Sequence, residues 1–180
     1  TRGLISGSIA LLMVTDLEFE PGDIDLYVPL SQEDTAIRLC IQELDFVQTE
    51  SRDSLYDNSS SVKTVHWLEN SSRRMNIIVV ENENPAVAVF RFHSTVVMNF
   101  LCSRGLYCAY PSLTLYHLSI PNSGLMMSDA EVAQKCRDCF EKYRERGIRF
   151  ERDPRTFPGH GIHACFVDAE CTSTIRSTED

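Results

Sequence analysis

The stretch GLISGSIALLMVTDLEFEPGDIDLYVP, which spans residues 3–29, decides the fold of this chain. A Gly-Ser pair, Gly7–Ser8, precedes an apolar run, and Asp23 and Asp25 open a β-branched, aromatic segment after a loop. Alternate side chains of a strand point to the same face, so both carboxylates are expected together while Ile24 turns into the core. Adjacent carboxylates repel each other unless a cation lies between them. The pattern therefore indicates a Mg²⁺ site of the kind commonly shared with phosphate oxygens.

Beyond this stretch, the sequence alternates between strand-like and helix-like patterns. Segments 62–68 and 74–80 alternate polar and apolar residues, and the polar segment 69–72 between them fits a hairpin turn. We therefore predict an α+β (α/β-like) fold, a mixed β-sheet flanked by helices with an irregular Cys/His-containing C-terminal tail. The expected strands are 3–7, 23–28, 46–50, 62–68 and 74–80, and the expected helices are 8–15, 31–44, 93–101 and 128–146.

Three of these helices carry signals at their ends. Ser31 fits the N-cap of helix 31–44, and Ser128 opens the last helix, which Gly147 follows. The start of helix 93–101, His93-Ser94-Thr95, fits either an ordinary cap or a phosphate-binding helix start, and the cap is favoured because it needs no ligand. The predicted buried stripe of helix 31–44 consists of Ala36, Ile37, Cys40, Ile41 and Leu44.

The length of 180 residues suits one domain with a substantial core and a small appendage. We expect a core over residues 1–127, and a C-terminal helix with a Cys/His-rich tail over 128–180 that packs on it. The chain begins at Thr1 rather than Met, which is consistent with a fragment of a longer protein.

Composition and charge exclude some classes of protein. No apolar run reaches the ~18 residues needed to cross a bilayer, and no secretory signal is visible, so no membrane association is expected. The net charge of −9 argues against extended nucleic-acid binding, although a local cluster such as Arg73–Arg74 could hold a small nucleotide. Seven cysteines, an odd number, favour reduced thiols and an intracellular, cytoplasmic or nuclear location.

The order of motifs resembles that of the nucleotidyltransferase superfamily, which has the DNA-polymerase-β-like fold. Its signature is a hydrophobic residue, Gly, Gly or Ser, a spacer, and then Asp-hydrophobic-Asp-hydrophobic. The resemblance implies that Gly7 and Ser8 bind the nucleotide triphosphate and that Asp23 and Asp25 are catalytic ligands of Mg²⁺. Over residues 3–178 the chain also resembles a group of fungal nucleotidyltransferase-like proteins, on the segments ISGSIALLM, PGDIDLYVP, FHSTVVMNFLCSRGLYCAYPSLTL and CFEKYRERG.

The third carboxylate of that family falls here on Asn76, in the strand 74–80. An amide can ligate Mg²⁺ weakly but cannot act as a general base. Glu81 or Glu83 could replace it only against the expected register. The implied function is therefore Mg²⁺-dependent transfer of a nucleoside monophosphate from an NTP to an unknown acceptor. The alternative is a catalytically degenerate module of the same fold that binds nucleotide or another protein.

The C-terminal region offers four soft metal ligands. Cys139, His163, Cys165 and Cys171 are expected to converge on a structural Zn²⁺, with Cys136 as a substitute for one of them. The alternative is that Cys136 and Cys139 pack as small hydrophobic residues on one helix face. The basic and acidic residues between 141 and 155 interleave, which is typical of a solvated charged surface. Trp67 and His66 are expected to have core or edge roles in their strand.

Overall fold

The computed structural model describes residues 2–53, 61–122 and 130–151 of the chain. They divide into two compact units. Unit 1 extends to Phe92 and also includes Val97–Cys108, while unit 2 consists of His93–Val96 and the chain from Ala109 onwards. The boundary expected between residues 127 and 128 falls inside unit 2 and stays a prediction.

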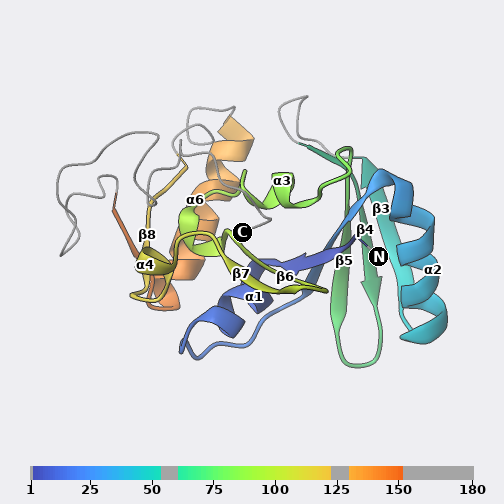
Figure 1. The fold of residues 1–180 in the computed structure, drawn as a ribbon, viewed down its shortest axis with the longest axis horizontal. Helices are drawn as coiled ribbons and strands as arrows, with labels where there is room; N and C mark the ends of the chain where they lie inside the picture. The colour runs from blue at the N-terminus through green and yellow to red at the C-terminus, as the bar shows by residue number, and fades with distance from the viewer. Residues whose placement is uncertain (1, 54–60, 123–129, 152–180) are drawn as a thin grey trace. The chain divides into compact units, whose positions relative to one another are not determined.

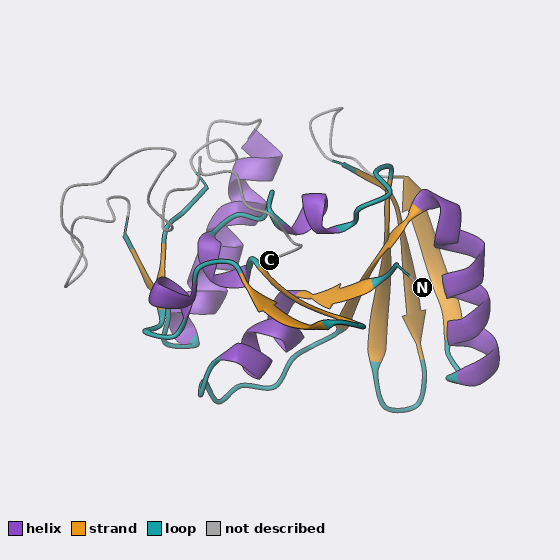
Figure 2. Cartoon of the chain, viewed as in Figure 1, coloured by secondary structure: helices purple, strands orange, loops and turns teal. Residues whose placement is uncertain are grey.

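Unit 1 is built on a seven-stranded mixed sheet with the strand order β3-β4-β5-β2-β1-β6-β7 (Figures 1 and 2). The central neighbours β2 and β5 run parallel, and every other neighbouring pair in this sheet is antiparallel. The predicted α+β fold with a mixed sheet is therefore confirmed. The strands are β1 (Leu4–Ser6), β2 (Ile24–Pro29), β3 (Val47–Asp53), β4 (Val62–Glu69), β5 (Arg74–Val80), β6 (Asn99–Cys102) and β7 (Gly105–Cys108).

Short helices connect these strands. Helix α1 (Gly7–Val14) follows β1 directly, and the 3-10 turn η1 (Leu30–Gln32) leads from β2 into α2 (Glu33–Glu43). Helix α3 (Ala86–Val89) and the 3-10 turn η2 (Thr95–Val97) lie between β5 and β6. Both α1 and α2 were expected from the sequence pattern.

Helix α2 covers one face of the sheet. Its Ala36 and Cys40 are buried in a hydrophobic cluster with alternate residues of β2, β4 and β5. The members from the strands are Val28, Leu68, Met75, Ile77 and Val79, with Ile24 and Leu26 packed against them. Because side chains alternate along a strand, Asp23, Asp25 and Asn76 are directed to the opposite face.

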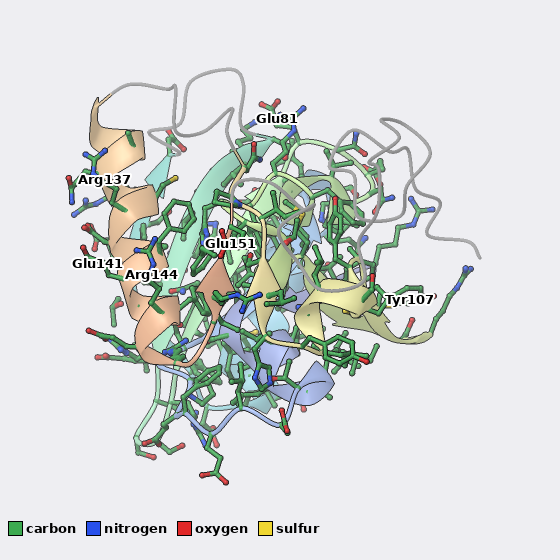
Figure 3. The ribbon with its side chains drawn as sticks, turned by 90° about the vertical axis from the view of Figure 1, so that its left-hand side faces the viewer. Glu81, Tyr107, Arg137, Glu141, Arg144 and Glu151 are labelled. Atoms are coloured by element: carbon green, nitrogen blue, oxygen red, sulfur yellow. The ribbon has the colours of Figure 1, made fainter. Side chains whose placement is uncertain are left out.

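Unit 2 contains α4 (Pro111–Thr114), α6 (Ala130–Glu145) and the parallel strand pair β8 (Leu118–Ser119) and β9 (Arg149–Phe150). The buried side of α6 carries Cys136, Phe140 and Tyr143. Its outer side is charged, and Figure 3 shows Arg137, Glu141 and Arg144 directed away from the helix. This arrangement agrees with the interleaved charges of the sequence.

Three local expectations were wrong. The helix expected at 93–101 is replaced by η2 and β6, because Leu101 pairs with Ile5 of β1 and the apolar run is used for strand pairing. Ser31 does not cap α2; its hydroxyl donates to Glu83 Oε2 instead. Ile41 and Leu44 are 41% and 53% exposed, so the buried stripe of α2 is shorter than predicted.

Among the described residues, no helix is both long and apolar enough to cross a bilayer. The expected cap Ser128 and the C-terminal tail lie outside the described residues.

Candidate functional site

The turn from β1 into α1 brings Gly7 against the second aspartate. Ser6 pairs with Asp25 across β1 and β2, and Gly7 has a φ of +70°. A Cβ atom on Gly7 would overlap Asp25 Oδ2. Only glycine combines this left-handed backbone with so close an approach. Ser8 follows at 3% exposure, so the expected Gly-Ser pair begins α1 beside the carboxylates.

The two aspartates and Asn76 form one polar cluster on adjacent parallel strands. Asp25 lies beside Asn76 in the register of β2 and β5. The Asn76 amide nitrogen donates to Asp23 Oδ2 over 2.9 Å and to Asp25 Oδ1 over 2.8 Å. The amide thus spans both carboxylates, as a cation between them would. It brings no charge of its own, so it does not cancel theirs.

The donor set suits magnesium. Carboxylate oxygens are the protein ligands that Mg²⁺ takes most often, usually one or two per site, with water and phosphate oxygens filling the rest. Asp23 and Asp25 supply two such groups, and both side chains are partly exposed. An amide group has an oxygen acceptor as well as its nitrogen donors, so rotation of the Asn76 amide would present a third oxygen. The described residues therefore fit this metal.

Neither alternative acid can complete the cluster. Glu81 lies five residues beyond Asn76, which is about 16 Å along a strand. Glu83 accepts hydrogen bonds from Arg2 and Ser31. Asn76 is therefore the residue that occupies the expected third position.

Trp67 is a neighbour of the cluster that sequence reasoning assigned to the core or an edge. It pairs with Asn76 in the antiparallel register of β4 and β5, so both side chains project from the same face. Strand β4 is an interior strand, and the Trp67 side chain is partly exposed. Residues that pair across two strands are far apart in sequence, so only the hairpin register could have revealed this neighbour.

His93-Ser94-Thr95 does not begin a helix of the expected kind and belongs to unit 2. The His93 ring packs edge-on against Phe140 at 5.4 Å and tilted against Tyr143 at 5.6 Å. Burial, with a smaller contribution from Lys142, lowers the pKa of His93 to about 4. The imidazole is therefore neutral at physiological pH. Its packing against aromatic rings explains the residue without a phosphate ligand.

The zinc prediction extends outside the described residues. His163, Cys165 and Cys171 are not described, whereas Cys136 and Cys139 are free thiols on α6. Burial raises the pKa of both thiols, which favours the protonated form rather than the thiolate that binds zinc. The described residues contain no group of three or more His, Cys, Asp or Glu side chains that could hold a metal ion.

Comparison with known proteins adds no identification. No protein-family model matches the chain, and neither a curated protein nor a solved structure is similar enough to be reported as a relative.

Proposed function

We propose that this protein is a Mg²⁺-dependent nucleotidyltransferase, which transfers a nucleoside monophosphate from an NTP to an acceptor and releases pyrophosphate. The observation that carries this proposal is the cluster in which Gly7, Asp23, Asp25 and Asn76 converge on one face of the sheet. The nucleotidyltransferase-like fold that the sequence resembles is part of the same proposal.

Each residue has a role that follows from its position. Asp23 and Asp25 hold Mg²⁺, which would neutralise charge on the phosphoryl group and on the leaving pyrophosphate. Gly7 allows the backbone to lie directly against the Asp25 carboxylate, beside the proposed Mg²⁺ site. Ser8 is the second residue of α1, so its backbone N–H group lies at the helix start and would be available to the triphosphate.

A second function is favoured by one specific observation. Asn76 cannot remove a proton from a hydroxyl group, and its amide already satisfies both carboxylates. A non-catalytic module that binds nucleotide, or that binds another protein, would retain the site in this form. Nucleotidyl transfer remains the better proposal, because an asparagine in place of the third acid leaves both carboxylate ligands of Mg²⁺, Asp23 and Asp25, in place.

The test uses Trp67, which is the only tryptophan in the 180 residues and lies directly across from Asn76. Each of the four NTPs is titrated into the protein with Mg²⁺ and again with EDTA, while tryptophan fluorescence is recorded. Pyrophosphate release is then measured with a cell extract as the source of acceptor. We expect Mg²⁺-dependent quenching followed by release.

The variant Asp25→Asn should weaken the Mg²⁺-dependent binding at least tenfold, because one of two charged ligands is lost. Asp34→Asn on the exposed surface of α2 makes the same chemical change away from the site and should bind as the parent does. Binding that is unchanged in Asp25→Asn, with no pyrophosphate release, would favour the non-catalytic module. Absence of any Mg²⁺-dependent NTP binding would refute the transferase and the nucleotide-binding module, and would leave only a module that binds another protein.

A further inference from the structure

A cleft of about 440 Å³ lies at the end of the sheet where β2 and β5 begin. The loop before β2 contributes Glu20 and Gly22, and the β4–β5 hairpin contributes Glu69, Arg73 and Arg74. A volume of this size is typical of a site for a small molecule.

This cleft is next to the carboxylate cluster along both β2 and β5, because Gly22 and Arg74, which line it, lie one and two residues from Asp23 and Asn76. Arg74 precedes Asn76 by two residues on β5, so both side chains project from the same face at a spacing of about 7 Å. In the loop that leads into the neighbouring strand β2, Gly22 directly precedes Asp23, and a Cβ on Gly22 would lie 3.5 Å from an Arg74 guanidinium nitrogen. A ligand in the cleft would therefore reach the groups that we assign to Mg²⁺.

The hairpin that carries the arginines is held in shape by Asn70. The Asn70 side-chain oxygen accepts hydrogen bonds from the Ser72 amide, the Ser72 hydroxyl and the Arg73 amide, over 2.9–3.2 Å. The Asn70 backbone amide also donates to the Arg73 carbonyl. The backbone of Arg73 is thus held by the turn before any ligand binds, which lowers the backbone entropy lost on binding.

Within the described residues, neither Arg73 nor Arg74 forms an ion pair. Glu20 and Glu69 also line the cleft, so its total charge is close to neutral, yet they leave both guanidinium groups available. Guanidinium groups recognise phosphate through paired hydrogen bonds. Selection of a phosphate would therefore depend on direct contact with these two arginines rather than on a general positive field.

Asn76 gives a second argument about the acceptor, and this argument does not depend on the arginines. A hydroxyl nucleophile must lose its proton to a base, and the residue at the third position is an amide. A phosphate monoester is already ionised near neutral pH and needs no base, since its second pKa is about 6. In the part of the chain that the structure describes, the amide at the third position and the two arginines without an ion pair thus favour the same acceptor.

We infer that the cleft binds the acceptor of the proposed transferase and that this acceptor is a phosphate monoester, an inference that rests on the proposed function. An ionised oxygen of the acceptor phosphate forms a bond to the α-phosphorus of the NTP. The bond between that phosphorus and the α–β bridging oxygen breaks, and pyrophosphate leaves with the electron pair. The product contains a new phosphoanhydride, and no proton is transferred.

Inorganic phosphate is the probe that tests this inference on the full chain. Transfer to inorganic phosphate converts an α-labelled NTP into labelled NDP and leaves the γ-phosphorus in pyrophosphate. Simple hydrolysis at the γ-phosphate would instead leave that phosphorus in free phosphate. Glycerol 3-phosphate should also be an acceptor, whereas glycerol, which has only hydroxyl groups, should not. Calorimetric titration of phosphate in the presence of Mg²⁺ and an α,β-methylene NTP measures binding separately from turnover.

Arg73→Ala and Arg74→Ala should each weaken phosphate binding about tenfold, because each removes a charge-assisted contact. Their affinity for NTP, read from Trp67 fluorescence, should stay within about twofold of the parent. Arg38→Ala, an exposed arginine of α2, is the matched control and should change neither quantity. Glu69→Gln should tighten phosphate binding, since it removes a negative charge from the cleft.

The outcomes separate the two proposals. Mg²⁺-dependent NTP binding with phosphate binding unaffected by the arginine variants would refute the acceptor assignment alone. Arginine variants that weaken NTP binding but not phosphate binding would assign the cleft to the nucleotide and overturn the inference. Equal use of glycerol and glycerol 3-phosphate would also overturn it. Loss of all Mg²⁺-dependent NTP binding would refute the proposed function, and the acceptor assignment with it.

Discussion

Acidic side chains on the two faces of the central sheet have different hydrogen-bond partners. On the face covered by α2, His66 Nε2 lies 2.7 Å from Glu33 Oε1, and its other ring nitrogen lies 3.3 Å from Gln48 Nε2. The His66 and Glu33 side chains are 8% and 25% exposed. Each polar group in this set has a partner within the fold, so the set is explained by structure alone.

On the opposite face, one neutral amide bridges two carboxylates. The Asn76 amide donates to both acids, and Gly7 adopts a left-handed backbone conformation that brings it against Asp25. Hydrogen bonds from an amide orient carboxylates but leave their charge in place. The covered face thus pairs an acid with a histidine, whereas the opposite face pairs two acids with a neutral amide, and the proposed Mg²⁺ site rests on this second arrangement.

The largest expected effect is that of Gly7→Ala. An L-residue at φ +70° costs about 1–2 kcal/mol, and the overlap of its Cβ with Asp25 adds to that cost. We expect the free energy of unfolding to fall by about 3 kcal/mol and Mg²⁺-dependent nucleotide binding to be lost. Urea denaturation and Trp67 fluorescence measure the two effects. A variant as stable as the parent would show that Gly7 is not held tightly against Asp25.

Asn76→Asp adds a third negative charge beside Asp23 and Asp25. It replaces two hydrogen bonds with repulsion among three carboxylates, so stability without metal should fall by about 2 kcal/mol. Millimolar Mg²⁺ should restore most of that loss, because it binds the folded state in preference to the unfolded chain. Asn76→Ala removes the hydrogen bonds without adding charge and serves as the matched control. Destabilisation of Asn76→Asp that Mg²⁺ does not relieve would contradict a cation site.

His93 can be compared with His66, because among the described residues it packs against two aromatic rings rather than a carboxylate. Burial lowers its folded pKa to about 4, below the ordinary value of 6.5, so the unfolded chain takes up the proton more readily. The stability that depends on neutral His93 is present above pH 6.5 and is lost as the pH falls toward 4. Between pH 7 and pH 5 we expect a loss of about 1.5 kcal/mol.

The variant His93→Phe removes this titration and keeps an aromatic ring against Phe140 and Tyr143. Urea denaturation at several pH values gives the difference between the variant and the parent. That difference should be flat above pH 7 and should favour the variant increasingly as the pH falls toward 5. A difference that does not change with pH would mean that His93 is accessible to protons in the folded protein.

The smallest effect is expected on the covered face. Glu33→Gln keeps a hydrogen-bond acceptor for His66 but removes the charge, so the free energy of unfolding should fall by about 1 kcal/mol. Mg²⁺ should stabilise this variant by the same amount as the parent, as thermal melting can measure. A changed response to Mg²⁺ would show that the two faces are coupled rather than independent.

The elements with strong local patterns could be predicted from sequence. Strands β4 and β5 begin and end within one residue of their expected bounds, because alternation and the intervening turn are local signals. The region from His93 to Leu101 could not be predicted in the same way. Its apolar residues are compatible with a helix or a strand, and the choice was made by the pairing of Leu101 with Ile5, far away in the sequence.

The sequence by itself determined the chemistry of the candidate site: a Gly-Ser turn, two aspartates on one strand face, and an asparagine where a third acid is expected. Only the tertiary structure decided how these groups meet. The register of β2 and β5 places the Asn76 amide between the carboxylates, and the β4–β5 hairpin sets Trp67 and the arginine cleft beside them. Residue types and local spacing can be read directly from the sequence. Contacts between distant strands depend on the strand register, which is set by burial of apolar surface and by backbone hydrogen bonding.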